Sequence, residues 1–527
     1  MNDLEKTERH LPKRLKGLWK LLFGRTTMFA LLLAVQIIVL FGGFAVLGTQ
    51  IIAANYVVGF SAFLILVYLL NSKQDSAMRM TWILIIASIP IFGVVLFIYT
   101  RIQPGTSSLK ERTMELQEQQ RNYLQPDRET LELEMVEARQ EYGLFKYIYE
   151  EGNFPSYRDA CVRFFPLGED KFREMLRQLD RAEKFIFMEY FIIEKGEMWD
   201  AIFEILKKKA EEGVEVRLMY DGTCTLSLLP RKFPKEMEDC GIQCKEFSPM
   251  VPFLSTHQNN RDHRKILVID GRVAFTGGVN LADEYINRKV RFGHWKDTAI
   301  MVQGAAVDSF TLMFLQMWNL RETGREQYLE YIVAADQPID EDMHRGGLIA
   351  PYGDSPLDDE PVGEKVYLDI INRASEHVHI MTPYLILSET MIHSLIYASQ
   401  RGIDVKIILP HIPDKKYAYW LARTYYRELI TGGVKIYEYT PGFVHAKVFT
   451  SDNIRSVVGT INMDYRSLYL HFECAAYIYN NPVVEDIEED FMDTLDMCER
   501  ITLENCRTFS PVGKVIGRAL RIIAPLM

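Results

Sequence analysis

The chain has 527 residues, with 60 lysine and arginine residues against 71 aspartate and glutamate residues, so its formal net charge at pH 7 is −11. This acidic excess argues against a dedicated DNA-binding protein, because such proteins usually carry a basic surface that meets phosphate. At roughly 100 to 200 residues per domain, the length allows two or three domains and excludes a short peptide. The seven cysteines are odd in number and irregularly spaced, so they neither require nor exclude an oxidising compartment.

The N-terminal region combines a basic segment, residues 1–25, with long uncharged runs. No charged side chain occurs from Thr26 to Leu70 or from Met80 to Thr100. A helix crosses a bilayer core in about 20 residues, so we expect two or three transmembrane helices within residues 26–100 and a multi-pass protein of the cell membrane. The predicted spans lie near Met28–Leu47, Ile51–Leu70 and Thr81–Thr100.

The side of the membrane that carries the rest of the chain depends on the number of spans. The basic N-terminal segment is expected to stay in the cytoplasm under the positive-inside rule. Three spans would then place everything after Arg101 outside, whereas an interfacial first segment would leave it inside. Residues 101–150 are rich in charge and predict a solvated helical neck with i,i+4 charge pairs.

Beyond residue 150 the sequence repeats one layout. The segment that starts at Lys184 and the segment that starts at His377 each predict a strand, an amphipathic helix (near 198–212 or 389–401), a glycine stop and a second buried strand. Gly213 and Gly402 are the two stops. We therefore predict two α/β lobes with mostly parallel sheets, residues 151–335 and residues 336–527, and one site where the two lobes meet.

The two lobes carry the same motif at matching places. The first copy, "HRKILVIDGRVAFTGGVN", contains His263, Lys265, Asp270, Gly278 and Asn280, and the second copy, "HAKVFTSDNIRSVVGTIN", contains His445, Lys447, Asp452, Thr460 and Asn462. Residues i and i+2 of a strand point to one face, so each histidine and its lysine can reach one ligand. One such motif is a weak signal, but two in register within a repeat form a strong one.

This set of side chains suits a phosphodiester. One neutral histidine can attack phosphorus, the other can protonate the leaving alcohol, and Lys265, Lys447 and the amides of Asn280 and Asn462 can hold the negative charge. The small residues Gly278 and Thr460 would let backbone approach the ligand. Asp270 and Asp452 belong to the motifs, but each lies seven residues after its histidine beside a hairpin turn, so we interpret them first as structural.

Each histidine needs a partner that fixes its tautomer, and a carboxylate is the usual one. Asp297 follows the first motif and Glu473 follows the second, so both are candidates. Arg466 and Ser467 either bind phosphate or pack the turn. No cluster of carboxylates with Mg²⁺ or Ca²⁺ spacing lies beside the motifs, so we expect neither a metal nor another cofactor. His377 and His379 share a strand face, but no third ligand lies near them in the sequence.

These motifs resemble those of the phospholipase D superfamily, which carries two H-x-K-x4-D sequences. More narrowly, "NNRDHRKILVIDGRVAFTGGVNLADEY", "FGHWKDT", "VHAKVF" and "VGTINMDYRSLYLHFE" are similar to bacterial cardiolipin synthases of the two-motif type. The resemblance runs from about Asn55 to the C-terminus. It implies transfer of a phosphatidyl group from one phosphatidylglycerol to another, giving cardiolipin and glycerol through a phosphatidyl-histidine, with His263 as nucleophile and His445 as acid, or the reverse.

Two other functions compete with this one. A phosphodiesterase or nuclease of the same superfamily would need a basic groove, which the acidic charge disfavours, so we expect no nucleic-acid partner. A catalytically silent membrane scaffold would keep the fold without using the histidines. The C-terminal tail is basic and amphipathic, with Lys514, Arg518 and Arg521 at helical spacing, and either lies on anionic membrane lipid or docks on the core. The oligomeric state is open.

Overall fold

The computed structural model describes residues 52–72, 74–101, 104–250, 259–322, 328–332, 338–358 and 360–526, together with Ala34 and Ile38. The chain divides into two compact units. The first contains residues 1–105, 222–230 and 248–259, and the second contains 106–221, 231–247 and 260–527. The predicted span Met28–Leu47 lies outside the described residues except for Ala34 and Ile38.

Among its described residues, the first unit contains the apolar helices α4 (Ile52–Leu70), α5 (Ser76–Ser88) and α6 (Pro90–Arg101), together with the short helix α12 (Cys224–Ser227). Asp75 caps α5 by accepting hydrogen bonds from the backbone of Ala77 and Met78. Phe97 of α6 packs edge-on against Trp82 of α5, with ring centroids 5.3 Å apart. Among the residues that the structure describes, no helix combines the length and the apolar character needed to cross a membrane.

The predicted single helix over Thr81–Thr100 is wrong, because the structure breaks it into α5 and α6. Ile89 between them has φ −137° and ψ 76°, which is not helical. The cause is Pro90, whose ring disfavours helical geometry in the preceding residue and which has no N–H for the helical ladder. Proline is well tolerated in the first turn of a helix, where α6 begins.

The segment predicted to be a solvated neck is helical but not free-standing. It forms α7 (Pro104–Arg121), α8 (Arg128–Val136) and α9 (Tyr142–Glu150). Leu116, Phe145 and Ile148 are almost fully buried in the core of the second unit. Glu141 accepts hydrogen bonds from Arg455 and from the Tyr477 hydroxyl, at 2.6 and 2.8 Å. The prediction of a solvated neck is based on the charged residues. The apolar residues between them attach this segment to the second unit.

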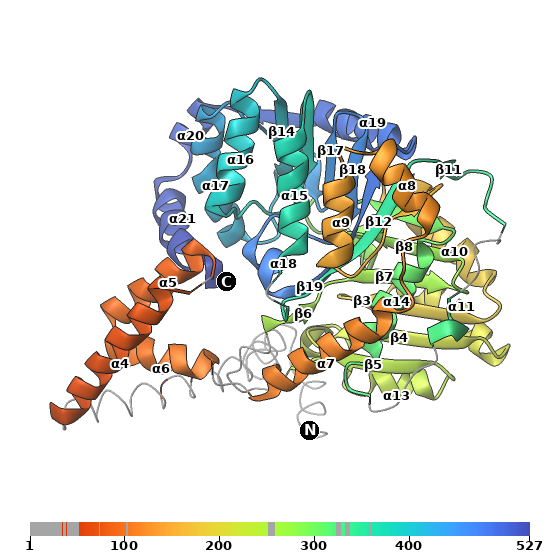
Figure 1. Ribbon diagram of the computed structural model, residues 1–527, viewed down its shortest axis with the longest axis horizontal. Helices are drawn as coiled ribbons and strands as arrows, with labels where there is room; N and C mark the ends of the chain where they lie inside the picture. The colour runs from red at the N-terminus through yellow and green to blue at the C-terminus, as the bar shows by residue number, and fades with distance from the viewer. Residues whose placement is uncertain are drawn as a thin grey trace, which may run out of the picture. The chain divides into compact units, whose positions relative to one another are not determined.

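The second unit contains two large mixed sheets (Figure 1) and a two-stranded sheet of β16 (Gly442–Val444) and β9 (His294–Lys296). The first sheet has the order β11-β2-β10-β8-β7-β3-β4-β5, and the second has the order β1-β12-β19-β18-β17-β13-β14-β15-β20. The strands of the first sheet are β2 (Cys161–Phe165), β3 (Phe185–Tyr190), β4 (Glu215–Asp221), β5 (Gln243–Phe247), β7 (Lys265–Ile269), β8 (Val273–Gly277), β10 (Ala299–Gln303) and β11 (His344–Arg345). Those of the second sheet are β1 (Tyr157–Arg158), β12 (Leu348–Asp354), β13 (His377–Met381), β14 (Asp404–Pro410), β15 (Lys435–Tyr439), β17 (Val448–Ser451), β18 (Arg455–Gly459), β19 (His471–Tyr479) and β20 (Cys498–Ile501).

The internal repeat is visible in the strand order. The run β2-β10-β8-β7-β3-β4-β5 corresponds strand by strand to β12-β19-β18-β17-β13-β14-β15. The prediction of mostly parallel sheets is wrong, because only the pairs β3–β4, β4–β5, β13–β14 and β14–β15 along these two runs are parallel. The βαβ units produce those pairs, whereas the motif strands are joined by tight hairpins, which make neighbours antiparallel.

Helices cover the faces of both sheets and lie at their contact. The repeat helices are α11 (Glu197–Glu211) and α16 (Glu389–Gln400), close to the predicted ranges. α14 (Val307–Trp318) packs against β3, β7 and β8 of the first sheet and against β12 of the second. The remaining described helices of this unit are α10 (Gly168–Asp180), α13 (Phe233–Glu238), α15 (Val362–Arg373), α17 (Lys416–Thr431), α18 (Tyr465–Tyr469), α19 (Val483–Asp496), α20 (Leu503–Thr508) and α21 (Pro511–Ile523), with 3₁₀ turns at Asp283–Ile286, Tyr328–Glu330 and Ala524–Leu526.

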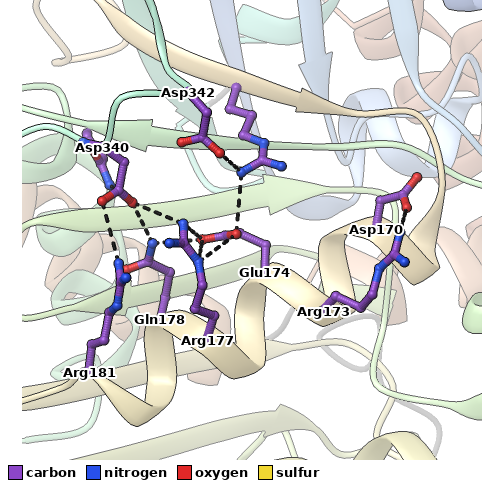
Figure 2. Close-up of polar contacts among 10 residues, drawn as sticks. Asp170, Arg173, Glu174, Arg177, Gln178, Arg181, Asp340 and Asp342 are labelled. Carbon is purple, nitrogen blue, oxygen red and sulfur yellow. Dashed lines mark hydrogen bonds and ion pairs between the residues drawn. The ribbon is translucent and has the colours of Figure 1, made fainter.

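The two halves of the repeat exchange short strands, so no clean boundary separates residues 151–335 from 336–527. β1 lies within residues 151–335 but pairs with β12 of the second sheet, and β11 lies within residues 336–527 but pairs with β2 of the first sheet. The connection before β11 is held on α10 by an ionic network: Asp340 accepts hydrogen bonds from Gln178 and Arg177, and Arg181 lies 3.5 Å away (Figure 2). The two lobes therefore form one body.

The C-terminal helix α21 docks on α17. Gly513 and Gly517 face Trp420, and a Cβ on Gly517 would lie 2.4 Å from the Trp420 carbonyl oxygen, so only glycine permits this approach. The Arg521 guanidinium lies over the ring of Tyr425, 4.3 Å from its centroid. Val512 and Val515 on the other side are exposed. Of the two alternatives for the tail, docking on the core is the one seen within this unit.

Asp270 and Asp452 close equivalent turns. Both have positive φ, 56° and 55°. The Asp270 carboxylate accepts hydrogen bonds from three successive backbone N–H groups, those of Glu183, Lys184 and Phe185, at 2.7–2.9 Å. Asp452 does the same for residues 375–377, at 2.9–3.2 Å. Each aspartate therefore ties its hairpin to the start of the neighbouring strand, in line with the structural interpretation.

We predict that Asp270→Ala and Asp452→Ala destabilise the fold rather than stop chemistry. Each change removes charge-assisted hydrogen bonds from several N–H groups, so we expect a loss of about 2 kcal/mol in unfolding free energy. Thermal unfolding of the purified variants would measure this loss, and activity per folded molecule would be compared with that of His263→Ala. A folded Asp452→Ala protein as inactive as the histidine variant would contradict the structural role.

Candidate active site

His263 and Lys265 lie where a short strand of the first half meets the second sheet. β6 (Arg261–Asp262) pairs in parallel with the start of β19, and the backbone N–H of His263 donates to the Phe472 carbonyl at 2.9 Å. Lys265 begins β7, and its Nζ donates to the His263 carbonyl at 2.5 Å. His263 is 7% exposed and Lys265 is 1% exposed. Both are therefore anchored in the interior of the unit.

His445 and Lys447 are anchored in the corresponding way by the first half. β16 (Gly442–Val444) pairs in parallel with β9 (His294–Lys296), and the His445 N–H donates to the Lys296 carbonyl at 2.7 Å. Lys447 Nζ contacts the His445 carbonyl and lies 3.0 Å from His445 Nδ1. Each histidine thus attaches through its main chain to a strand of the other half.

The predicted partner carboxylates bind across the halves. His445 Nδ1 lies 2.7 Å from Oδ2 of Asp297, which follows the first motif. His263 Nδ1 lies 2.9 Å from both carboxylate oxygens of Glu473, which follows the second motif. Asp297 and Glu473 are fully buried. Because a ring nitrogen bonded to a carboxylate carries the proton, the arrangement leaves Nε2 of each histidine as the reactive atom.

The small residues of the motifs make room for these carboxylates. A Cβ on Gly278 would lie 2.0 Å from the Asp297 carboxylate oxygen Oδ1, so only glycine fits there. At the equivalent position of the second motif, the Thr460 hydroxyl donates to Glu473 instead. The expectation that these residues allow backbone to approach the ligand is therefore not what the structure shows: they allow the orienting carboxylates to approach and hold them.

Asn280 and Asn462 are each tied to a hydroxyl of the turn that follows. Asn280 Nδ2 donates to the Tyr285 hydroxyl at 2.8 Å, and its Oδ1 accepts from the backbone of Ile192 at 3.0 Å. Asn462 Nδ2 donates to Ser467 Oγ at 3.0 Å. One N–H of each amide is thus used within the protein. For Ser467 this contact, and its backbone bond to Asp464, match the turn-packing alternative.

The two histidines and two lysines of the motifs influence one another's pKa values and therefore lie in one site. Burial and then Lys265, His471, Lys447 and His445 hold the pKa of His263 well below its ordinary value. Burial and Lys447 lower the pKa of His445 to about 4, although Asp297 acts in the opposite direction. Burial also lowers the pKa of Lys265 to about 8 and that of Lys447 to about 7. Burial raises the pKa of Glu473 well above its ordinary value, against the effect of Lys265 and Thr460.

These shifts share a physical meaning. Cationic forms are disfavoured because the four basic side chains are desolvated and crowd one another. A bound anion would supply the missing counter-charge and would strengthen every hydrogen bond that these groups donate. The site is therefore suited to a phosphate group, whose oxygens accept such bonds.

Aromatic side chains that the sequence motifs do not reveal enclose the histidines. The ring of Phe191 lies 5.0 Å from that of His263, and the rings of Tyr285, Trp295 and Phe443 lie 5.4–5.7 Å from that of His445. A further histidine, His471, lies 5.5 Å from His263, ring to ring. The available sequence signal for His471 is its place two residues before Glu473, on the same strand face.

Within the described residues, two groups of three side chains have ligand atoms close enough for a metal ion: His263 with His471 and Glu473, and His377 with His379 and Glu488. The structure thus supplies the third ligand for His377 and His379 that the sequence lacked. In both groups a lysine lies near the histidines, and its positive charge would repel a metal ion. Lys265 lowers the pKa of His471, and Lys406 Nζ lies 3.1 Å from His379 Nε2. The donor sets therefore fit a metal ion poorly.

Comparison with known proteins gives consistent results. Residues 175–318 and 367–495 match the family model described as cardiolipin synthase, PLD-like domain. An uncharacterized protein of Streptococcus mutans is 51% identical over 461 residues, 87% of this chain and 99% of that protein. The cardiolipin synthase of Alkalihalophilus pseudofirmus is 32% identical over 453 residues, 85% of this chain and 88% of that protein. The fold is similar to that of phosphatidylserine synthase from Haemophilus influenzae, with TM-score 0.52, 13% identity, and coverage of 73% of this chain and 98% of that chain.

We predict that each histidine and its carboxylate, His445 with Asp297 and His263 with Glu473, contribute to catalysis together, so that losing both costs little more than losing the histidine. Asp297→Asn replaces the carboxylate with a neutral amide whose N–H can face Nδ1 of His445 and favour the wrong tautomer, so we expect kcat for a phosphodiester substrate to fall roughly 10²- to 10⁴-fold. Adding His445→Asn to Asp297→Asn should cost little more than His445→Asn alone. Glu473→Gln should behave in the same way with His263, and steady-state kinetics of the four single and two double variants would measure this. Fully multiplicative losses for Asp297 with His445 would contradict the pairing.

Proposed function

Because this chain belongs to the phospholipase D-like family of phosphatidyltransferases related to cardiolipin synthase, we propose that it transfers a phosphatidyl group from one phosphatidylglycerol to another and releases glycerol. The single observation that carries the proposal is that two buried, carboxylate-bound histidines, one from each half of the repeat, lie close enough for His445 and Lys447 to lower the pKa of His263. Its substrates would be bilayer lipids, so we expect the enzyme to work at a membrane.

In the proposed first step, Nε2 of neutral His263 attacks phosphorus. The bond between phosphorus and the glycerol oxygen breaks, and protonated His445 gives its proton to that oxygen, so that glycerol leaves as a neutral alcohol. Lys265 and Lys447 hold the phosphate oxygens while negative charge builds on them. The lipid is then attached to His263 through a phosphorus–nitrogen bond.

In the second step, a hydroxyl of the acceptor phosphatidylglycerol attacks phosphorus. His445, now neutral, takes the hydroxyl proton, the phosphorus–nitrogen bond breaks and His263 is restored. The charges favour this division of roles over the reverse. Asp297 raises the pKa of His445 and so promotes its protonated form. Burial, followed by Lys265, His471, Lys447 and His445, lowers the pKa of His263 and so favours the neutral nucleophile.

The decisive experiment is to trap the covalent intermediate. Phosphatidylglycerol labelled in its acyl chains or in its head group is incubated with the His445→Asn variant, which keeps the nucleophile His263. Loss of the acid slows formation of the adduct, and loss of the base that activates the acceptor slows its breakdown, so long incubations are sampled. We expect the acyl label to be fixed to His263 and the head-group label to stay in solution. Wild-type protein incubated with phosphatidylglycerol alone should form cardiolipin. A separate incubation offers the wild-type protein a labelled oligonucleotide. Loss of the oligonucleotide without cardiolipin would favour a nuclease, and unchanged lipid with intact histidines would favour a scaffold.

The pKa of about 4 for His445 predicts the pH dependence. Above that value the protonated fraction of His445 falls about tenfold for each pH unit, while His263, with a pKa well below its ordinary value, stays neutral. Lys447, with a pKa of about 7, loses its charge in the same direction. We therefore expect kcat/KM to rise as pH is lowered from 8 to 6, measured with phosphatidylglycerol in mixed micelles. A rate that increases with pH over this range would contradict the assigned acid.

A further inference from the structure

A third buried imidazole, His471, lies in the site without a bonding partner. It begins β19, is 7% exposed, and its ring lies 5.5 Å from that of His263. Its Nδ1 is 3.6 Å from Oε1 of Glu473, which is too long for a hydrogen bond. Within the part of the chain that the structure describes, neither ring nitrogen of His471 has a hydrogen-bond partner, and both are buried.

Other buried histidines of this unit are bonded at one or both nitrogens. His263 and His445 each bind a carboxylate, and His379 has Glu488 at Nδ1, 2.6 Å away, and Lys406 at Nε2, 3.1 Å away. Buried polar atoms are nearly always paired, because an unpaired one forfeits its bonds to water. A ring with two unpaired nitrogens beside the reacting histidine is therefore best explained by a partner that arrives with the substrate.

The charges around His471 indicate which chemical group that partner is. Arg261 is its register neighbour on β6, and burial followed by Arg466, Lys265, Arg261 and Lys415 keeps the pKa of His471 well below its ordinary value. The ring is thus neutral, with one donor and one acceptor. A phosphate oxygen would use only the donor. A hydroxyl group can accept from the ring N–H or donate to the unprotonated nitrogen, so it can bond to whichever nitrogen of His471 faces the substrate.

We propose that His471 binds one hydroxyl of the vicinal diol in the glycerol head group, and that it thereby selects a diol over water as the acceptor. The proposal rests on the phosphatidyltransferase function above. In the second step one hydroxyl of the acceptor attacks phosphorus on His263 and gives its proton to His445. The neighbouring hydroxyl hydrogen-bonds to His471, 5.5 Å from His263 ring to ring, and keeps the attacking oxygen in line. Water has no second hydroxyl and loses this contact.

The test compares wild-type protein with His471→Leu and His471→Asn in vesicles of phosphatidylglycerol. Leucine removes the donor and the acceptor, whereas asparagine keeps one of each. We expect the ratio of cardiolipin to phosphatidic acid, the hydrolysis product, to fall at least tenfold in His471→Leu and less in His471→Asn. With added alcohols, wild-type protein should prefer 1,2-propanediol over 1-propanol as acceptor, and His471→Leu should lose that preference.

His379→Asn is the matched control. His379 is a buried histidine, 4% exposed, whose two nitrogens are both bonded. Its variant should lose thermal stability and keep both product ratios. His471→Leu should unfold at the same temperature as wild type or higher, because it removes unpaired polar atoms from a buried place.

The outcomes separate the two proposals. Wild-type protein that forms neither cardiolipin nor a phosphatidyl alcohol would overturn the proposed function and the role of His471 with it. Active wild-type protein, together with a His471→Leu variant that keeps the diol preference, would overturn only the role of His471. A lower unfolding temperature in His471→Leu with unchanged product ratios would show that the ring is structural and would equally overturn the inference.

Discussion

The hydrogen bonds from His263 to Glu473 and from His445 to Asp297 are the interactions on which the rest of this molecule depends. Each joins a histidine of one half to a fully buried carboxylate of the other. A half that folded alone would therefore carry a histidine without its orienting group and a buried carboxylate without its partner. Since a buried unpaired charge is strongly destabilising, the same bonds that prepare the site also favour the assembled form.

The main chain at each histidine is also bonded to the opposite half of the repeat. The strand just before His445 (β16) pairs with the strand that leads to Asp297 (β9), and the strand just before His263 (β6) pairs with the strand that contains Glu473 (β19). The backbone N–H of each histidine donates to the carbonyl of the residue just before its carboxylate partner, Lys296 or Phe472. Position and orientation are thus set by two bonds per histidine. The exchange of β1 and β11 between the sheets adds further connections of this kind.

The site holds unmet charge and unmet hydrogen bonds that a substrate would satisfy. Lys265 and Lys447 are buried, with pKa values lowered to about 8 and about 7. Each lysine donates to the carbonyl oxygen of its motif histidine, and among the described residues neither is bonded directly to a carboxylate. His471 adds two unpaired nitrogens. Under the proposed function, a phosphodiester with a glycerol head group would supply the anion and the hydroxyls that these groups lack.

The motifs and the repeat could be found in the sequence because they depend on short-range patterns. Strand alternation places a histidine and a lysine two residues apart on one face, and the hairpin at Asp270 and Gly271 follows from residues that tolerate positive φ. The helices near 198–212 and 389–401, and Asp297 and Glu473 as candidate partners, followed from the same kind of evidence. What these patterns leave open is the direction and pairing of the strands. Most neighbouring strands are antiparallel, and Pro90 divides a run that composition alone treats as one helix.

The sequence by itself determined which residue types meet phosphate chemistry and that they occur twice. Only the tertiary structure decided that each carboxylate serves the histidine of the opposite half, that Gly278 makes space for Asp297 while Thr460 holds Glu473, and that His471 stands unpaired beside His263. The reason is physical. Contacts between residues some 150 to 210 positions apart depend on how two sheets pack, and no local periodicity carries that information.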